Sequence, residues 1–202
     1  MGLLISDFIN RFSAVMPEYL DKMPWEVTDS LSDIIFRLMD QLGKEYIIKD
    51  GIAIHQSATI EQNVILKLPV FIGENARIGA NAYIRGPVYI DTGVHIGAGC
   101  EIKQSAIFAD SAVAHFNYIG NSIIGSNVNF EAGSVAANHY NERENKIISV
   151  LYEDEIIITG IKKFGSLVGD ACKVGANAVL SPGTILKKGT VVKRLELIEQ
   201  LK

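Results

Sequence analysis

The stretch GENARI-GANAYI-RGPVYI-DTGVHI-GAGCEI, residues 73–102, ends every group of six residues in isoleucine. The spacing continues on both sides, and the last position of successive groups is filled by Ile54, Ile60, Leu66, Ile72, Ile78, Ile84, Ile90, Ile96, Ile102, Phe108 and Ala114. A smaller residue lies two positions before each of these from Ile60 onward: Ala58, Val64, Val70, Ala76, Ala82, Val88, Val94, Cys100, Ala106 and Ala112. Residues two apart on a strand point the same way, so each group sends one small and one large side chain inward. A constant spacing of six does not fit an amphipathic helix and predicts a mainly β protein, a parallel β-helix built from hexapeptide repeats.

The expected corners of this β-helix are rich in glycine, asparagine and aspartate, as at 73–75, 79–81, 91–93 and 97–99. These residues tolerate the positive φ of a tight bend. The phase of the repeat then shifts, with Ile124, Phe130 and Ala136 in a new frame, and resumes at Val168, Val174, Leu180, Leu186 and Val192. We infer that a segment is inserted between the two runs.

The inserted segment, residues 138–164, begins with a polar run that has no core pattern. Two apolar stretches follow, at 147–151 and 156–158, and four polar residues separate them. This pattern predicts an extruded β-hairpin. Such a loop either contributes to a binding surface or is a mere appendage.

The first 48 residues have a helical period instead, with apolar residues at Leu31, Ile34, Ile35, Leu38, Met39 and Leu42. Asp29 or Ser30 would cap this helix and Gly43 would end it, and a shorter helix is expected around 4–12. We expect the helices to cap the open first turn of the β-helix, with docking of a partner as the alternative. The predicted division is a helical cap at 1–48, the β-helix at 49–194 and a tail at 195–202.

Composition narrows the classes of function. The net charge is -4, which gives no basic surface for nucleic acid. No apolar run is long enough to span a membrane, and the first twenty residues do not resemble a signal peptide, so we expect a cytoplasmic protein. Cys100 and Cys172 fall on the small inward position, where we expect them to pack as apolar residues rather than form a disulfide or bind metal.

Arg85, Lys103 and His115 are polar residues that the repeat does not require. Arg85 and Lys103 are eighteen residues apart, so three hexapeptides per turn would stack them on one corner about 5 Å apart. Two such cations either bind an anion between them or are simply solvated. His115 lies twelve residues further on, which predicts a different corner. A site formed by all three residues then requires either that the phase shift brings the corners together or that a second chain packs alongside.

Three motifs carry a resemblance to a known family: Tyr83-Ile-Arg85-Gly-Pro, His115-Phe-Asn-Tyr-Ile-Gly120, and Gly125-Ser-Asn-Val-Asn-Phe-Glu-Ala132-Gly. Together with Lys162-Lys-Phe-Gly-Ser-Leu-Val-Gly-Asp170, they resemble the acetyltransferase half of the bifunctional N-acetylglucosamine-1-phosphate uridylyltransferase/glucosamine-1-phosphate acetyltransferases, especially the archaeal-type sugar-1-phosphate nucleotidylyltransferase/acetyltransferases. The resemblance covers nearly the whole chain, and the nucleotidyltransferase domain of that family is expected to be absent. It implies a left-handed β-helix that forms a homotrimer with sites between subunits.

The resemblance also implies an activity, the transfer of an acetyl group from acetyl-CoA to the amine of an amino-sugar phosphate such as glucosamine-1-phosphate, without a metal. A separate nucleotidyltransferase is then a candidate partner. The implied roles are His115 as general base, Ala132 as backbone donor to the oxyanion, Arg85 and Lys103 as phosphate ligands, Tyr118 and Asn129 as amino-sugar contacts, and Asn138 and Ala176 as contacts to coenzyme A.

Departures from the family pattern keep alternatives open. Glu131 stands where the family has glycine, His139 stands where it has tyrosine, and its loop lysine aligns with Lys146. One alternative is a non-catalytic protein that kept the scaffold and binds nucleotide sugars, and another is an acyltransferase with a different acceptor. A zinc enzyme on the same fold would need clustered histidines, and His55, His95, His115 and His139 show no close pair in the sequence.

Overall fold

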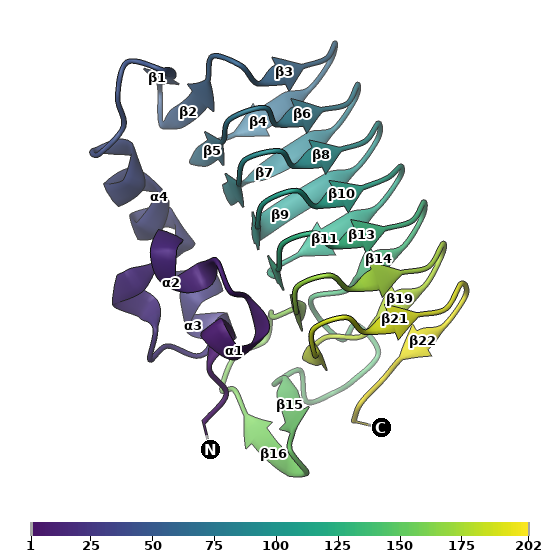
Figure 1. Ribbon diagram of the computed structural model, residues 1–202. Coiled ribbons are helices and arrows are strands. Elements are labelled where there is room, and N and C mark those ends of the chain that lie inside the picture. The colour runs from purple at the N-terminus through teal and green to yellow at the C-terminus, as the bar shows by residue number, and fades with distance from the viewer. Residues whose placement is uncertain (1, 202) are drawn as a thin grey trace.

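The computed structural model describes residues 2–201, which form a parallel β-helix of about eight turns with short helices along one side (Figure 1). Most turns carry three short strands, one on each face of a triangular prism. The predicted fold class, a left-handed parallel β-helix built from hexapeptide repeats, is confirmed.

The prism has three faces, which we call the β8 face, the β11 face and the helix-covered face. The β8 face holds β3 (Thr59–Ile60), β6 (Arg77–Ile78), β8 (His95–Ile96), β10 (Ala112–Val113), β13 (Asn129–Phe130), β18 (Lys173–Val174) and β21 (Val191–Val192). The β11 face holds β4 (Ile65–Lys67), the first parts of β7 (Tyr83–Ile90) and β9 (Glu101–Ile107), β11 (Tyr118–Gly120), β14 (Val135–Ala136), β19 (Val179–Leu180) and β22 (Leu197–Ile198). The helix-covered face holds β2 (Ile52–His55), β5 (Val70–Ile72), the last parts of β7 and β9, β12 (Ile123–Ile124), β17 (Ser166–Val168) and β20 (Thr184–Leu186), and β1 (Tyr46–Lys49) pairs antiparallel with β2.

The inward side chains of all three faces form one apolar core that runs the length of the prism. Ile72, Ile84 and Ile96 lie in it, as the spacing of six predicts. Cys100 and Cys172 are buried there as free thiols, so their predicted role as small core residues is confirmed.

The phase of the repeat shifts earlier than predicted, at the corner between the β11 face and the helix-covered face. Arg85 lies beside Lys103, but Val88 lies beside Ser105, one residue short of the same spacing. The corner is shorter in the later turn because Gln104 alone fills it, with a φ of 45°.

This shortened corner moves the inward positions of the following turn, as far as Ile119, back by one residue. Ile107 and Val113 therefore point into the core. Four predicted inward positions are wrong for this reason: Phe108 and Ala114 as large residues, and Ala106 and Ala112 as their small partners. Phe108 is fully buried, but on the side of the helices rather than inside the prism.

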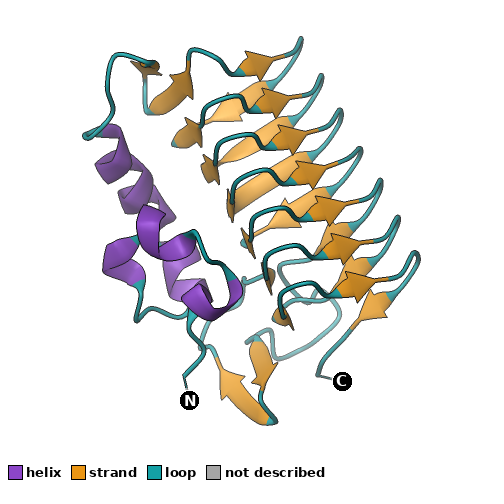
Figure 2. Ribbon diagram, in the orientation of Figure 1, coloured by secondary structure: helices purple, strands orange, loops and turns teal. Residues whose placement is uncertain are grey.

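The helical segments are α1 (Ile5–Phe8), α2 (Phe12–Val15), the 3₁₀ turn η1 (Pro17–Tyr19), α3 (Pro24–Asp29) and α4 (Leu31–Met39). They lie along one face of the prism and not over its first turn (Figure 2). The prediction that they cap the first turn is therefore wrong. The outward residues of this face, including Phe71, Tyr89 and Leu167, are apolar and share one buried cluster with Ile34 and Ile35 of α4.

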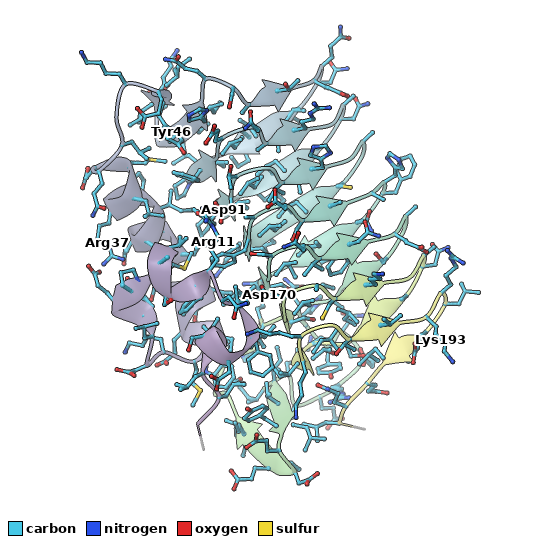
Figure 3. All side chains as sticks on the ribbon, viewed as in Figure 1. Arg11, Arg37, Tyr46, Asp91, Asp170 and Lys193 are labelled. Carbon is cyan, nitrogen blue, oxygen red and sulfur yellow. The ribbon has the colours of Figure 1, made fainter. Side chains whose placement is uncertain are left out.

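A buried carboxylate anchors the helical segment to the prism. Arg11, just before α2, places its Nε 2.6 Å from Oδ2 of Asp91, which follows β7 (Figure 3). Asp91 is nearly fully buried, and a buried carboxylate requires such a partner.

The predicted hairpin in the insertion is confirmed as β15 (Ser149–Tyr152) and β16 (Glu155–Ile158). β15 packs against β20, and the ring of Tyr152 lies 5.8 Å from that of Phe8. Beyond residue 194, where a tail was predicted, β22 pairs with β19 and continues the prism. Across residues 2–201, no helix has the length and apolar character needed to cross a membrane.

Candidate functional site

His115, Ala132 and Ala176 occupy equivalent corner positions in three consecutive turns, between the β8 face and the β11 face. Backbone bonds fix this alignment, because the N–H groups of Gly133 and Asn177 donate to the carbonyls of His115 (2.8 Å) and Ala132 (3.0 Å). The three residues come from sequence positions up to 61 apart, yet they form one line along the edge of the prism. We call this line, continued by Arg194 in the next turn, the His115 corner.

The imidazole of His115 is exposed and lies above a glycine of the preceding turn. A Cβ on Gly97 would collide with the carbonyl oxygen of Ala114 and would lie 3.0 Å from Nδ1 of His115. Only glycine therefore lets the two turns approach this closely. The result is a shallow pocket of about 410 Å³ whose lining also includes Arg77 and His95.

The His115 corner is fixed from inside the prism by Asn117. Its Nδ2 donates to the carbonyl of Glu131 (2.7 Å) and to Oγ of Ser134 (2.7 Å), and the thiol of Cys100 lies 3.6 Å from its Oδ1. Phe116, at the apex of the same corner, is 76% exposed. The corner is thus held by buried hydrogen bonds, while its outer surface is open.

The backbone N–H of Ala132 has no hydrogen-bond partner among residues 2–201. Ala132 is exposed, one turn beyond His115, so this N–H is available to a ligand at the corner. Asn129 is exposed on β13 of the same turn, between Ala112 and Lys173 of the neighbouring turns.

Glu131 crosses the His115 corner with its side chain. Its Oε2 accepts a hydrogen bond from the backbone N–H of Ala176 (2.9 Å), and its two oxygens accept from Nε (2.8 Å) and Nη2 (2.9 Å) of Arg194. The Arg194 guanidinium, followed by the Ala176 N–H, lowers the pKa of the Glu131 carboxyl below its ordinary value. A groove of about 470 Å³ begins at this ion pair and is lined by two more cations, Lys173 and Lys193. Figure 3 shows Lys193 at the edge of the prism remote from the helices.

The predicted stacking of Arg85 and Lys103 on the β11 face is observed, since the two residues are partners in neighbouring turns. Arg85 is not unpaired, however, because its Nη1 lies 2.5 Å from Oε1 of Glu101. The hydrogen bond to Glu101 raises the pKa of Arg85, and the guanidinium also lies 5.5 Å from the ring centroid of Tyr83. Among residues 2–201, Lys103 forms no ion pair with a carboxylate, although the charge of Glu101 also acts on it.

A third cation, Lys163, approaches Lys103 from the end of the insertion. Burial lowers the pKa of Lys103, and the charges of Lys163 and Arg85 lower it further. The family's loop lysine aligns with Lys146, which is exposed in the polar run, and this alignment does not single out Lys163. The sequence feature that could have pointed to Lys163 is the adjacent Phe164. This apolar residue is fully buried and holds the end of the insertion in place.

Tyr118 and Asn138 come close together above Gly120. A Cβ on Gly120 would lie 2.5 Å from Oη of Tyr118 and 2.9 Å from Cγ of Asn138. Burial raises the pKa of Tyr118. Asn138 is almost fully buried, and its Nδ2 donates to Oδ1 of Asn121 in the preceding turn (2.7 Å). Within one chain Asn138 therefore holds a corner of the β-helix together.

The eight predicted site residues form two groups. His115, Asn129, Ala132 and Ala176 lie at the His115 corner or on the adjoining β8 face, whereas Arg85, Lys103, Tyr118 and Asn138 lie on or beside the β11 face. Tyr118 follows His115 by three residues, on the other side of the corner at Phe116. Within residues 2–201, no three or more His, Cys, Asp or Glu side chains are grouped so that they could hold a metal ion.

Comparison with known sequences gives consistent matches. Residues 66–161 match the family model described as the GMPPB C-terminal domain. The chain is 32% identical over 164 residues to the bifunctional protein GlmU of Methanococcus maripaludis. The aligned residues are 79% of this chain and 39% of that protein. It is 34% identical over 84 residues to the bifunctional sugar-1-phosphate nucleotidylyltransferase/acetyltransferase of Sulfurisphaera tokodaii, covering 41% and 20%. The chain thus spans about two fifths or less of the length of these relatives.

Solved structures with detectable similarity include a hexapeptide transferase family protein from Anaplasma phagocytophilum, at 19% identity and a TM-score of 0.38, covering 73% of this chain and 74% of that one. Another is PerB from Caulobacter crescentus in complex with CoA and GDP-perosamine, at 17% identity and a TM-score of 0.29, covering 71% and 54%.

Proposed function

We propose that this chain, a hexapeptide-repeat homologue of the bifunctional sugar-1-phosphate nucleotidylyltransferase/acetyltransferases, transfers an acetyl group from acetyl-CoA to the amine of an amino-sugar phosphate. The observation that carries this proposal is the His115 corner. An exposed imidazole there lies one turn from the unpartnered N–H of Ala132.

The chemistry of N-acetylation requires both groups. An amine must lose a proton as it attacks the thioester carbon, and an imidazole that titrates near neutral pH is suited to accept that proton. The carbonyl oxygen becomes negative in the tetrahedral intermediate, so a fixed backbone donor such as the Ala132 N–H stabilises it. The thiolate of coenzyme A then leaves, taking up a proton, as the amide product forms.

The cations of the β11 face are suited to the acceptor's phosphate. Burial and the charges of Lys163 and Arg85 lower the pKa of Lys103, and an anion bound beside these cations would offset their repulsion. Arg85 is part of the same cluster, and Tyr118 lies in the turn above Lys103. We assign the sugar phosphate to this cluster, with Tyr118 and Asn129 as contacts to the sugar and Asn138 and Ala176 beside the acetyl donor.

The two groups of residues lie on different faces of one chain, which favours a site shared between chains. In a trimer, the β11 face of one subunit would meet the His115 corner of the next. The helix-covered face is already occupied within the chain, so the other two faces remain for such contacts. Light scattering would measure the mass of the assembly, and a monomer that turns over substrate would contradict the shared site.

The test of the activity is a thiol-release assay with acetyl-CoA and a panel of glucosamine-1-phosphate, galactosamine-1-phosphate, free glucosamine and a UDP-linked amino sugar. Turnover confined to phosphorylated amino sugars supports the proposal. His115→Ala should lower turnover by about 100-fold or more without changing the assembly. His55→Ala is the matched control and should leave turnover unchanged, because the His55 ring lies on the first turn, where it bonds Ser57 and packs against Tyr46.

One observation favours a non-catalytic scaffold as the second candidate. The Glu131 carboxylate already accepts a hydrogen bond from the Ala176 N–H, at the position assigned to acetyl-CoA. A well-folded protein that binds a UDP-linked amino sugar, but neither acetylates any member of the panel nor binds coenzyme A, would select this alternative.

A further inference from the structure

We propose that Glu131 and Arg194 form a gate across the His115 corner, and that the acyl donor binds by displacing the Glu131 carboxylate and pairing its phosphates with Arg194. This inference rests on the proposed function, since it assigns the donor to the groove beyond Ala132. It makes Glu131 a determinant of donor affinity rather than a catalytic residue.

The geometry of the ion pair places it in the donor's path. Glu131 belongs to the turn of Ala132, its hydrogen bond reaches the N–H of Ala176 one turn on, and Arg194 belongs to the turn after that. The carboxylate therefore spans the corner between the unpartnered Ala132 N–H and the groove lined by Lys173 and Lys193. A molecule extending from His115 into this groove must cross the Glu131 side chain.

The charges supply a reason for displacement. Lys173, Lys193 and Arg194 all line the groove, and Glu131 is the one acidic residue among the residues of its lining. Coenzyme A carries a diphosphate and a further phosphate, so it gains from the three cations and is repelled by the carboxylate. The side chain of Arg194 is 73% exposed, and Glu131 is its main hydrogen-bond partner. Arg194 is therefore able to turn toward a phosphate once its bonds to Glu131 are broken.

A comparison within the chain shows that a carboxylate is not required at this position. The equivalent place in other turns is held by Gly79, Gly97 and Gly175, which align with one another through backbone bonds along the prism. Glu61 has the same geometry as Glu131 at the other end of this line, with Oε2 accepting from the Ala80 N–H at 2.8 Å, but no arginine pairs with it. Glu61 is thus a built-in control for the loss of a corner carboxylate.

The experiment measures binding of coenzyme A by calorimetry to the wild-type protein, Glu131→Gln, Glu131→Gly and Glu61→Gln. We expect Glu131→Gln to bind about fivefold more tightly, because it loses the repulsive charge and the pairing with Arg194. Glu131→Gly removes the side chain as well and should bind about tenfold more tightly. Glu61→Gln should bind like the wild type, and melting temperatures check that each variant is folded.

The role of Arg194 is tested with two ligands. Arg194→Gln should weaken binding of coenzyme A but leave binding of the phosphate-free S-acetyl-pantetheine no weaker than in the wild type. If Glu131→Gln and wild type bind coenzyme A equally, the gate is overturned while the proposed donor stands. If neither of them binds it, both the donor and the gate are overturned. If only the Glu131 variants bind, the gate is supported and is closed in the wild type.

Discussion

The helix-covered face and the β11 face share one backbone repeat and differ only in the side chains that point outward. On the helix-covered face these side chains, such as Phe71, Tyr89 and Leu167, are apolar and are buried by the helices. On the β11 face they include Arg85, Lys103 and Tyr118, which are partly exposed. A β-helix can thus bury one face and leave another polar by changing outward residues, because the inward residues are already committed to the core.

The strongest test of this division is Phe108→Ala. Phe108 is fully buried between the prism and the helices, and its ring lies 6.2 Å from that of Phe12 and 5.8 Å from that of Tyr89. Removing it should lower the free energy of unfolding by about 3–5 kcal/mol, measured by urea denaturation. Phe116→Ala, at the next corner of the same turn, is the matched control, because that ring is largely exposed. Equal losses in the two variants would contradict the division between the faces.

The next test concerns the cations of the β11 face. Lys163→Ala should raise the KM for an amino-sugar phosphate by about tenfold, since one charge near the phosphate is lost, and should leave unfolding unchanged. Steady-state kinetics with the phosphorylated and free amino sugars measures this. Lys162→Ala changes the neighbouring exposed lysine and should have little effect. A rise in KM for the free sugar as large as that for its phosphate would argue against phosphate binding here.

The smallest expected effect is a change in titration. The hydrogen bond from Arg194 has the largest effect in lowering the pKa of Glu131 in the folded protein, and the Ala176 N–H lowers it further. A lowered pKa means that the ion pair stabilises the fold above the unfolded pKa of Glu131, and that this contribution disappears as the pH falls through the folded pKa. In Arg194→Gln, carboxyl-carbon NMR should show the pKa of Glu131 rising toward its ordinary value. An unchanged pKa would mean that Arg194 does not hold the carboxylate in solution.

Much of the fold could be predicted because isoleucine at every sixth residue leaves few architectures open. The shift at Gln104 could not be predicted, because Ala106, Phe108, Ala112 and Ala114 all fit the unshifted spacing of six. Only the backbone pairing shows that the corner at Gln104 is one residue shorter. The position of the helices was missed for a related reason. The apolar outward residues of the covered face recur once per turn, a period too long for a short window to detect.

The resemblance to the bifunctional enzymes is confirmed by the sequence matches, and it supplied candidate site residues that spacing alone could not. Spacing correctly placed Arg85 beside Lys103 in the neighbouring turn. It could not anticipate that Glu101 pairs with Arg85, because Glu101 stacks on Tyr83 and reaches Arg85 only diagonally. Lys163 was missed since a long insertion separates it in sequence from the cluster that it approaches.

Asn117 gives the His115 corner a property that bears on how such a protein diversifies. Its amide fastens the corner to the next turn from within the prism, through the Glu131 carbonyl and Ser134. These buried bonds hold the corner from within, independently of the exposed side chains of His115 and Phe116. Under the proposed function, substitutions on that outer surface can change the preference for an acceptor while His115 keeps its position.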